Sequence, residues 1–478
     1  MPLIFPSNTL SGGFSVDNSC RFNDGDSAYM YRSNGTPTSQ RKLTISTWLK
    51  RGTDMATTDY YMYFMGIQDT GVGDPRLTLG FTDSGQILAG ENGSPSEVWK
   101  MKTNAVYKDP GAWYHIVLSI DTTQATEANR LKIYVNGTQV TSFATSNYPT
   151  QDLDMDTTGD EINIACIDNT SPSGFLDGYI AEMVYSDGQA YAASDFGEFD
   201  EDSPTIWKPI DVSGLTFGDN GFYLDFEDSA NLGNDANGGT DFTTSGLAAI
   251  DQCTDSPTNN FAVANPLQAN ADTTFAEGNT WTRQLSSATA KMYAVSTIGM
   301  SAGKWYMEFK NVTNDNDSLY GITTNPNSDR VNNYYPGEQA HSFGFYGSDG
   351  NKYTGGSGSS YGSAASSNDI IGVALDITNE NLYFSINGTW QDSGDPTSGA
   401  TGTGAIDISG IGAGDGFYYF SAGSIDTSNY DNPYYNFGNP AFTISSGNAD
   451  GNGYGNFEYA VPSGYYALCT KNLAEFGG

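Results

Sequence analysis

The sequence contains few basic residues. Its 478 residues include 20 Lys and Arg against 56 Asp and Glu, which gives a formal net charge of −36. DNA, RNA and anionic lipid repel such a polyanion, so we expect neither a nucleic acid nor a membrane as a partner. The acidity favours solubility, and it also suits calcium or neutral glycans met at high ionic strength, where salt screens self-repulsion.

Histidine, cysteine and long apolar runs are also scarce. The two histidines, His115 and His341, offer little material for general-base catalysis. No segment approaches the about 18 apolar residues of a membrane span, and the first residues lack the basic region of a signal peptide. We therefore expect synthesis and folding in a cytoplasm. No C-x-x-C motif is present, which predicts free buried thiols at Cys20, Cys166, Cys253 and Cys469.

Aromatic and turn-forming residues are abundant. The chain has 31 Tyr, 25 Phe and 57 Gly, although hydrophobic residues make up only 37%. The aromatic content argues against disorder, and short alternating segments separated by Gly, Asn, Asp and Ser are typical of strands joined by turns. We therefore predict an all-β protein.

Two similar hairpins stand in opposite halves of the chain. The segment "LKIYVNGTQV" (131–140) and the segment "NLYFSINGTWQ" (381–391) each run from an alternating strand into Asn-Gly-Thr. Asn-Gly between alternating strands predicts a tight antiparallel hairpin. The strands before them, 113–120 and 370–377, alternate in the same way, so we expect two antiparallel β-sandwiches in series.

Changes in amino-acid composition along the sequence indicate the domain boundaries. We predict a first sandwich over 1–228, a connector rich in small polar residues over 229–270, and a second sandwich over 271–478. Within the second, "YTGGSGSSYGSAASSN" (353–368) is rich in Gly and Ser and predicts a flexible surface loop.

Longer motifs in each half resemble known families. "AWYHIVLSIDTTQATEANRLKIYVNGTQV" (112–140), followed by "FLDGYIAEMVYSDGQAYAASDFGE" (175–198), resembles a laminin-G/pentraxin-like domain of the concanavalin A-like group. "GMSAGKWYMEFK" (299–310), "DIIGVALDITNENLYFSINGTW" (369–390) and "YYNFGN" (434–439) resemble a SPRY domain. Both families are bent jelly-roll-type β-sandwiches, which accounts for a repeated hairpin without an exact duplication.

The tandem as a whole resembles proteins of tailed phages of marine bacteria. The resemblance implies a non-enzymatic virion protein, a tail fibre or surface appendage that binds host cell-surface polysaccharide during adsorption. It also implies other virion proteins as partners and, by analogy with phage fibres, a homotrimer. The alternative is a structural capsid or tail decoration protein that makes only protein–protein contacts.

Catalytic patterns are missing or incomplete. Glycoside hydrolysis needs two carboxylates across the scissile bond, and the E-x-D-x-x-E strand pattern of glucanases is absent, with Glu198–Glu201 as the nearest approach. Gly299–Gly303 formally matches the G-x-S-x-G nucleophile elbow around Ser301. That motif requires a helix to follow, whereas the next residues alternate as a strand. We therefore predict no enzyme activity.

One acidic segment has the spacing of a calcium loop. "QDLDMDTTGDE" (151–161) places carboxylates at alternate positions, and hard oxygen ligands suit calcium. The EF-hand pattern is broken, so a solvated acidic turn stays the alternative. Calcium is the one candidate cofactor and none is required; its candidate ligands are Asp152, Asp154, Asp156, Asp160 and Glu161.

Aromatic and polar residues cluster in three loops of the second half. Aromatic faces stack on pyranose C–H surfaces, and neighbouring Asp, Asn and Gln bind the hydroxyls. The alternative is that these side chains anchor loops or form oligomer contacts. The candidate glycan-binding residues are Tyr334, Tyr335, Trp390, Gln391, Asp392, Tyr430, Asp431, Tyr434 and Tyr435.

Overall fold

The chain divides into two compact units. The computed structural model describes residues 13–52, 61–68, 75–92, 97–158, 161–168, 171–285, 290–312, 317–412, 414–427 and 432–477. The N-terminal unit is Leu10–Thr258, and the C-terminal unit contains Asn259–Gly478. The domain limits expected from the sequence stay a prediction. Residues 229–258 of the expected connector fall within the N-terminal unit.

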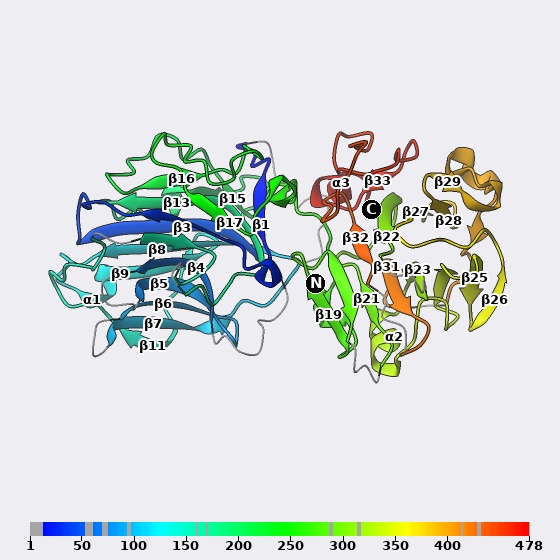
Figure 1. The fold of residues 1–478 in the computed structure, drawn as a ribbon, viewed down its shortest axis with the longest axis horizontal. Coiled ribbons are helices and arrows are strands. Elements are labelled where there is room, and N and C mark those ends of the chain that lie inside the picture. Colours follow the sequence, from blue (N-terminus) through cyan, green and yellow to red (C-terminus); the bar gives the residue numbers. More distant parts are fainter. Residues whose placement is uncertain are drawn as a thin grey trace. The chain divides into compact units, whose positions relative to one another are not determined.

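Two antiparallel sheets form the N-terminal unit (Figure 1). Sheet N1 has the order β10-β9-β8-β3-β13-β1-β18, with β16 also paired to β13; sheet N2 has the order β11-β7-β6-β5-β4-β12-β2-β17. The strands of N1 are β1 (Ser19–Phe22), β3 (Lys42–Arg51), β8 (Trp113–Asp121), β9 (Leu131–Val135), β10 (Thr138–Gln139), β13 (Gly178–Asp187), β16 (Phe222–Leu224) and β18 (Gln252–Cys253). Those of N2 are β2 (Tyr29–Ser33), β4 (Tyr61–Gln68), β5 (Pro75–Thr82), β6 (Gln86–Asn92), β7 (Glu97–Val106), β11 (Phe143–Asn147), β12 (Glu161–Ile164) and β17 (Thr243–Ser245). The unit also contains the β14–β15 pair (Gly197–Phe199 and Trp207–Pro209) and the short helix α1 (Glu127–Arg130).

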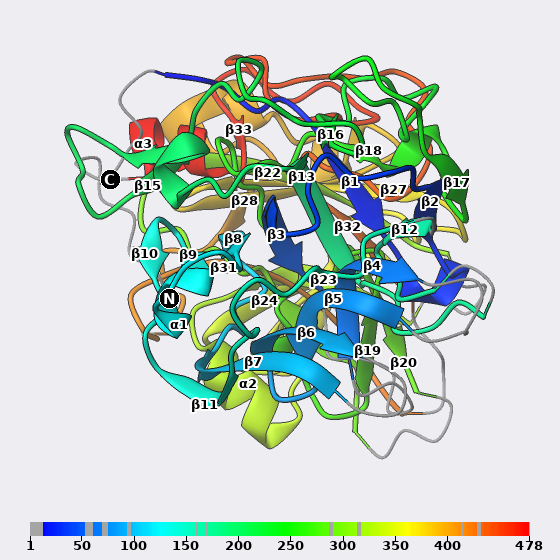
Figure 2. The same cartoon turned by 90° about the vertical axis from the view of Figure 1, so that its left-hand side faces the viewer.

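The core of the N-terminal unit lies between N1 and N2. Strand β8 shows why: Ile116, Leu118 and Ile120 are fully buried in this core, whereas Val117 packs in a second cluster on the opposite face. Figure 2 shows the two layers, with β9, β8, β3 and β13 in one and β7, β6, β5 and β4 in the other. The alternation predicted for 113–120 is therefore confirmed.

The C-terminal unit is likewise built from two sheets. Sheet C1 has the order β19-β20-β32-β22-β27-β28-β29, with β30 paired to β28 and β33 parallel to β22; sheet C2 has the order β21-β31-β23-β24-β25-β26. The strands of C1 are β19 (Thr273–Ala276), β20 (Trp281–Gln284), β22 (Lys304–Lys310), β27 (Ile370–Asp376), β28 (Asn381–Ile386), β29 (Thr389–Trp390), β30 (Ile406–Asp407), β32 (Tyr434–Asn436) and β33 (Tyr466–Ala467). Those of C2 are β21 (Tyr293–Val295), β23 (Ser318–Thr323), β24 (Ser342–Tyr346), β25 (Asn351–Thr354), β26 (Ser357–Ser360) and β31 (Tyr419–Ser424).

The main core cluster of the C-terminal unit draws on both sheets. Ile371 and Phe384 of C1 and Phe345 of C2 are all fully buried in it. The alternation predicted for 370–377 and 382–386 is therefore confirmed, and so is the all-β fold class with two sandwiches in series.

One local prediction is confirmed, the state of the cysteines, and two features differ from expectation, the Gly/Ser-rich run and two helices. The four cysteines are buried and free, as predicted. The Gly/Ser-rich run was predicted to be a loop, yet Asn351–Thr354 pairs with Ser357–Ser360, because Gly355 and Gly356 both adopt the positive φ of a tight turn. Two seven-residue helices were also missed: α2 (Pro326–Asn332) and α3 (Thr470–Phe476).

Across the described ranges, no helix combines the length and the apolar character needed to cross a bilayer.

The two Asn-Gly hairpins have nearly the same backbone. Asn136 and Gly137 adopt φ of 47° and 74°, and Asn387 and Gly388 adopt φ of 47° and 76°. Positive φ at both central residues defines the primed turn that matches the twist of antiparallel strands. The predicted hairpins are therefore confirmed, between β9 and β10 and between β28 and β29.

Each turn asparagine also forms two hydrogen bonds with the neighbouring strand. The Asn136 Oδ1 accepts a hydrogen bond from the His115 backbone N at 2.8 Å, and the Asn136 N donates to the His115 O at 2.9 Å. In the other unit, Asn387 exchanges the same two bonds with Ile370, at 3.0 and 2.9 Å. The asparagine side chain thus extends the ladder by one pair beyond the last residue of the strand.

Candidate functional site

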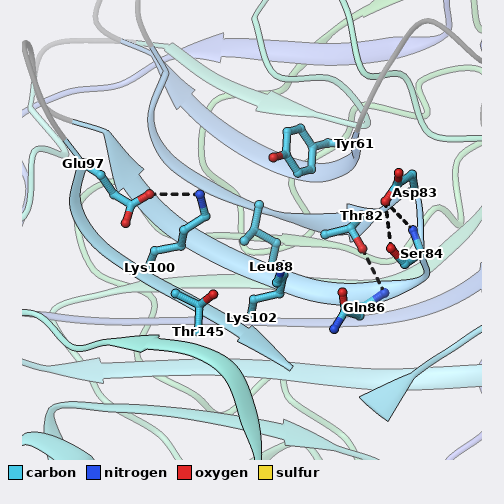
Figure 3. A pocket seen from close by; sticks show the side chains of 10 residues that line it. All are labelled: Tyr61, Thr82, Asp83, Ser84, Gln86, Leu88, Glu97, Lys100, Lys102 and Thr145. Carbon is cyan, nitrogen blue, oxygen red and sulfur yellow. Dashed lines mark hydrogen bonds and ion pairs between the residues drawn. The ribbon is translucent and has the colours of Figure 1, made fainter. Parts of the chain in front are cut away.

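A groove lies on the outer face of sheet N2. Along β7, Trp99 and Met101 are buried in the core, so Lys100 and Lys102 alternate onto the opposite face. A cavity of about 340 Å³ opens there (Figure 3), lined by Tyr61, Thr82, Asp83, Ser84, Gln86, Leu88, Glu97, Lys100, Lys102 and Thr145. A second cavity of about 160 Å³ shares part of this lining and adds Tyr63, Thr78, Gly90 and Trp99. We call the two together the N2 groove.

Strand pairing sets the rows of side chains across the groove. Lys102 lies opposite Leu88 of β6 on one side and Thr145 of β11 on the other. Gly90 lies opposite Lys100, and its missing side chain leaves the floor open. A Cβ placed on Gly90 would meet its nearest atom, the Trp99 backbone O, at 3.4 Å, which is ordinary contact. The groove is therefore open because residue 90 is a glycine, and the backbone there would also accept a larger residue.

Tyrosines form one wall of the groove. The rings of Tyr61 and Tyr63 are 5.7 Å apart between centroids, with an interplanar angle of 45°. Tyr63 is 8% exposed, whereas Tyr61 at the start of β4 is half-buried and its ring stands over the groove in Figure 3. A half-exposed ring above an open floor, with polar groups at the rim, is the arrangement that stacks on the C–H face of a sugar.

Polar side chains at the rim are held by local hydrogen bonds. The Gln86 Nε2 donates to the Thr103 O at 2.6 Å, and the Gln86 backbone N donates to the Thr82 Oγ1 at 3.1 Å. The Asp83 Oδ1 accepts from the Ser84 N and Oγ at 2.6 and 2.9 Å. The rim therefore offers amide, hydroxyl and carboxylate groups in set orientations.

The charges of the groove are unevenly paired. The Lys100 Nζ lies 2.9 Å from the Glu97 Oε2, with side chains 33% and 38% exposed. Lys102 has no carboxylate partner among the residues that the structure describes. The groove therefore presents one paired and one unpaired ammonium group beside an aromatic wall.

The first predicted glycan loop lies at the end of α2. Tyr334 and Tyr335 are both half-buried. The Lys291 Nζ stands 4.5 Å from the Tyr335 ring centroid and 2.7 Å from the Glu338 Oε2, while the Tyr335 N donates to Glu338 at 3.1 Å. These contacts fix the loop, as expected of a loop anchor.

The second predicted loop follows β29. Gln391 is buried: its Nε2 donates to the Thr389 O at 2.8 Å, and its Oε1 accepts from the Ser363 N at 3.0 Å. The Trp390 ring is half-buried and packs edge-on near Tyr306. Asp392, at φ 52°, is exposed. Of the three residues, only Asp392 is fully open to a ligand.

The third predicted loop divides between surface and core. Tyr435 is fully buried in the core, so its ring is not on a binding surface. Tyr434, the preceding residue on β32, faces outward and stacks on Trp281 at 4.9 Å with an interplanar angle of 5°. Tyr430 and Asp431 lie outside the described residues.

The predicted glycan residues do not converge. In sheet C1, three strands separate β32, which carries Tyr434, from β29, which carries Trp390. At a strand spacing of about 4.8 Å, these two residues are roughly 19 Å apart. Their role in binding stays a prediction, but the structure does not gather them into one site.

The predicted calcium ligands meet an arginine. The Arg41 Nη1 lies 3.2 Å from the Asp152 Oδ1, and its Nε lies 2.7 Å from the Asp154 Oδ1. Asp156 and Glu161 are half-buried, and Asp160 lies outside the described residues. Within the described part of the chain, no three His, Cys, Asp or Glu side chains form a group suited to a metal. Calcium therefore stays a prediction.

His115 is a buried structural residue. Trp207 Nε1 donates to its Nδ1 at 2.9 Å, so the proton of the neutral ring is on Nε2, which lies 2.8 Å from the Ser46 Oγ. The ring stacks on Trp48 at 4.7 Å. Burial lowers the pKa of His115 to about 3. Its side chain is thus held neutral within N1.

Ser301 and His341 are the other two residues considered for catalysis, and both contact neighbouring residues of the C-terminal unit. Ser301 precedes β22, a strand, and its Oγ donates to the Gly477 O at 3.1 Å, so the strand-to-helix context of a nucleophile elbow is missing. His341 Nε2 lies 2.6 Å from Asp329 Oδ1, whose partner oxygen accepts from Thr323 Oγ1 at 2.6 Å. Burial raises the pKa of Asp329.

The fold and the two units define a chain of tandem β-sandwich domains, and comparison with known families identifies them. Residues 24–190 match the concanavalin A-like lectin/glucanases superfamily, and residues 304–405 match the SPRY domain. The chain therefore carries a concanavalin A-like domain followed by a SPRY domain, which confirms that part of the resemblance.

Curated relatives match a short part of the chain. Ran-binding protein 9 of Mus musculus is 30% identical over 100 residues, which are 21% of this chain and 15% of that protein. The dual specificity protein kinase splA of Dictyostelium discoideum is 34% identical over 109 residues, which are 22% of this chain and 4% of that protein. The chain thus spans less than a fifth of the length of either relative.

Solved structures show similar partial matches. The SPRY domain of human HERC1 is 15% identical with a TM-score of 0.29, covering 36% of this chain and 96% of that one. A putative carbohydrate binding protein from Bacteroides ovatus is 14% identical with a TM-score of 0.33, covering 49% of this chain and 59% of that one. With TM-scores below 0.5, neither similarity bears on function.

Proposed function

We propose that this chain is a recognition protein that binds a glycan in the N2 groove without cleaving it. The observation that carries the proposal is the combination of an open glycine floor at Gly90, the Tyr61 ring above it and a polar rim. Sugars are recognised by such aromatic faces flanked by oriented hydrogen-bonding groups. The N2 groove supports glycan binding better than the predicted C-terminal residues, because it gathers its side chains in one place.

The groove allows a steric test on the full-length chain. Gly90→Val places a side chain on the floor, where a Cβ finds ordinary contact only, so the fold is expected to persist. We expect Gly90→Val and Tyr61→Ala to lower binding on a glycan array at least tenfold. The matched control is Gly410→Val, because Gly410 also has room for a Cβ, with no atom within 4 Å. Unchanged binding by a folded Gly90→Val protein would overturn the proposal.

The biological setting is a finer part of the same proposal. We propose that the protein sits on a phage virion, as a tail fibre or surface appendage, and attaches the particle to host polysaccharide. The tandem sequence resemblance supports this setting. Purified protein should compete with particles for adsorption to host cells. If labelling of the protein on intact particles places it on a capsid or tail surface that does not contact the host, the decoration role is favoured instead.

We also propose that the protein does not catalyse cleavage of the glycan that it binds. Ser301 leads into a strand, and the glucanase carboxylate pattern is absent from the sequence. Incubation with any polysaccharide that the protein binds should release no new reducing ends. Release that disappears in a Glu97→Gln or Asp83→Asn variant would contradict this part of the proposal, because these carboxylates line the groove.

A further inference from the structure

Two of the few basic residues of this chain lie in the same groove. Only 20 Lys and Arg occur in the sequence, against 56 acidic residues. Lys100 and Lys102 occupy alternate positions of β7, so both side chains project from the outer face of N2 into the groove. The same lining contains two carboxylates, Asp83 and Glu97, so the groove balances its charges locally in a protein that is otherwise strongly acidic.

Lys102 is the more available of the two. It lies between Leu88 and Thr145 in the cross-strand row, and neither neighbour can neutralise it. Lys100 is paired with Glu97, but both side chains are about one-third exposed, and an exposed pair of this kind is weak and exchanges readily. An incoming anion would therefore meet one unpaired ammonium group and a second that can leave its partner, while the Asp83 carboxylate at the rim is hydrogen-bonded to Ser84.

We propose that the N2 groove takes a glycan that carries an anionic substituent, a carboxylate or a sulfate, and that Lys102 binds this substituent directly. Lys100 turns from Glu97 to the same substituent as it enters. Tyr61 stacks on the sugar ring that bears it. The inference rests on the proposed glycan-binding function and specifies its ligand class.

The overall negative charge does not oppose this arrangement at close range. At about 0.1 M salt, charges more than about 10 Å apart are largely screened, whereas a direct ammonium–anion contact within the groove is screened far less. The distant carboxylates of the chain therefore weaken the encounter with an acidic glycan at low salt, and the local contact decides the affinity at moderate salt.

The test uses paired probes that share a sugar backbone and differ in whether it carries an anionic group. The full-length protein is measured against polygalacturonate and its methyl ester, and against dextran sulfate and dextran, at 0.15 M salt. We expect at least a tenfold preference for the charged member of one pair; which pair responds distinguishes carboxylate from sulfate. Lys102→Gln should abolish the preference, and Lys102→Arg should retain most of it.

A charge-matched control comes from the other sheet of the same unit. Lys132 on β9 is half-buried and has no carboxylate partner among the described residues, so Lys132→Gln removes the same charge away from the groove. It should leave the preference unchanged. Loss of the preference in Lys132→Gln as well would show that net charge, and not the groove, selects the ligand.

Two outcomes separate this inference from the proposed function. If the methyl ester and dextran bind as tightly as their charged partners, and Gly90→Val abolishes that binding, the groove is a glycan site but the anion assignment is wrong. If the folded protein binds none of these four probes and no other glycan on an array, glycan binding itself fails.

Discussion

The two Asn-Gly hairpins are alike in backbone and different in surroundings. Asn136 and Asn387 have the same φ and each exchanges two hydrogen bonds with the start of the neighbouring strand. The residue that donates one of those bonds and accepts the other is His115 in one unit and Ile370 in the other. The turn is therefore a backbone requirement of both sandwiches, whereas the residues packed against it are specific to each.

An aromatic ring covers the glycine of each turn. A Cβ on Gly137 would lie 2.3 Å from the Trp207 ring, and one on Gly388 would lie 2.5 Å from the Tyr459 ring. Trp207 is further tied to His115 by a hydrogen bond. The hydroxyl of Tyr459 has no hydrogen-bond partner in the part of the chain that the structure describes. The ring over the first turn is therefore held by a hydrogen bond, whereas the ring over the second is held by packing alone.

The largest difference between the turns should appear on acidification. His115 has a folded-state pKa of about 3 against 6.5 for the ordinary side chain, so its neutral form stabilises the fold. That stabilisation is complete above pH 6.5 and is lost as the pH falls toward 3, by about 1.4 kcal/mol per pH unit. His115→Asn keeps an acceptor for Trp207 and should remove this slope for the N-terminal unit.

The measurement is urea denaturation of the full chain at several pH values, followed by hydrogen exchange of each unit. Carboxylates titrate over part of the same range in both proteins, so the difference between wild type and His115→Asn isolates the histidine. Equal slopes in the two proteins would show that His115 is not held neutral by the fold.

The next largest effect should come from the turn glycines. Gly137→Ala combines a left-handed backbone, which costs about 1–2 kcal/mol outside glycine, with a clash worth about 1–3 kcal/mol. We expect Gly388→Ala to cost less, because the Tyr459 ring can move aside while Trp207 is held by His115. Thermal unfolding of the full-length variants measures both. A larger loss from Gly388→Ala would refute the distinction between the two turns.

The smallest effect should come from the turn asparagines. Asn136→Ala removes one side-chain hydrogen bond, from the His115 N, whereas Asn387→Ala removes two, from the Ile370 N and to the Asp369 Oδ1. Each bond contributes about 0.5–1.5 kcal/mol, and positive φ penalises alanine at both positions, so Asn387→Ala should be the more destabilised of the two. Asn136→Asp keeps the acceptor and tolerates positive φ, so it serves as the control. Equal losses for the two alanine variants in urea unfolding would show that the bond to Asp369 contributes nothing.

Local pattern predicted much of the fold. The alternation of Ile116, Leu118 and Ile120, and the Asn-Gly dipeptides, depend on neighbouring residues alone, and the structure confirms them. The β25–β26 hairpin was missed because the Gly/Ser composition outweighed the Gly355-Gly356 turn signal. Helix α2 carried a readable signal too, an Asn325 cap followed by Pro326.

The N2 groove could not be assembled from the sequence. The segment "WKMK" (99–102) alternates apolar with basic residues and indicates that both lysines leave the core. Nothing local, however, shows that Tyr61 and Thr145 lie on strands of the same sheet. Similarly, alternation separates Tyr434 from Tyr435 but does not say which of them faces the core. Register between distant strands decides both questions.

The pairing of β1 with β18 has a consequence for synthesis. Ser19 and Cys20 of β1 lie opposite Cys253 and Gln252 of β18, respectively. A nascent chain emerging from the ribosome exposes the free edge of β1 until residue 253 has left the exit tunnel. The first sandwich therefore completes its hydrogen-bonded edge only when translation of the second has begun.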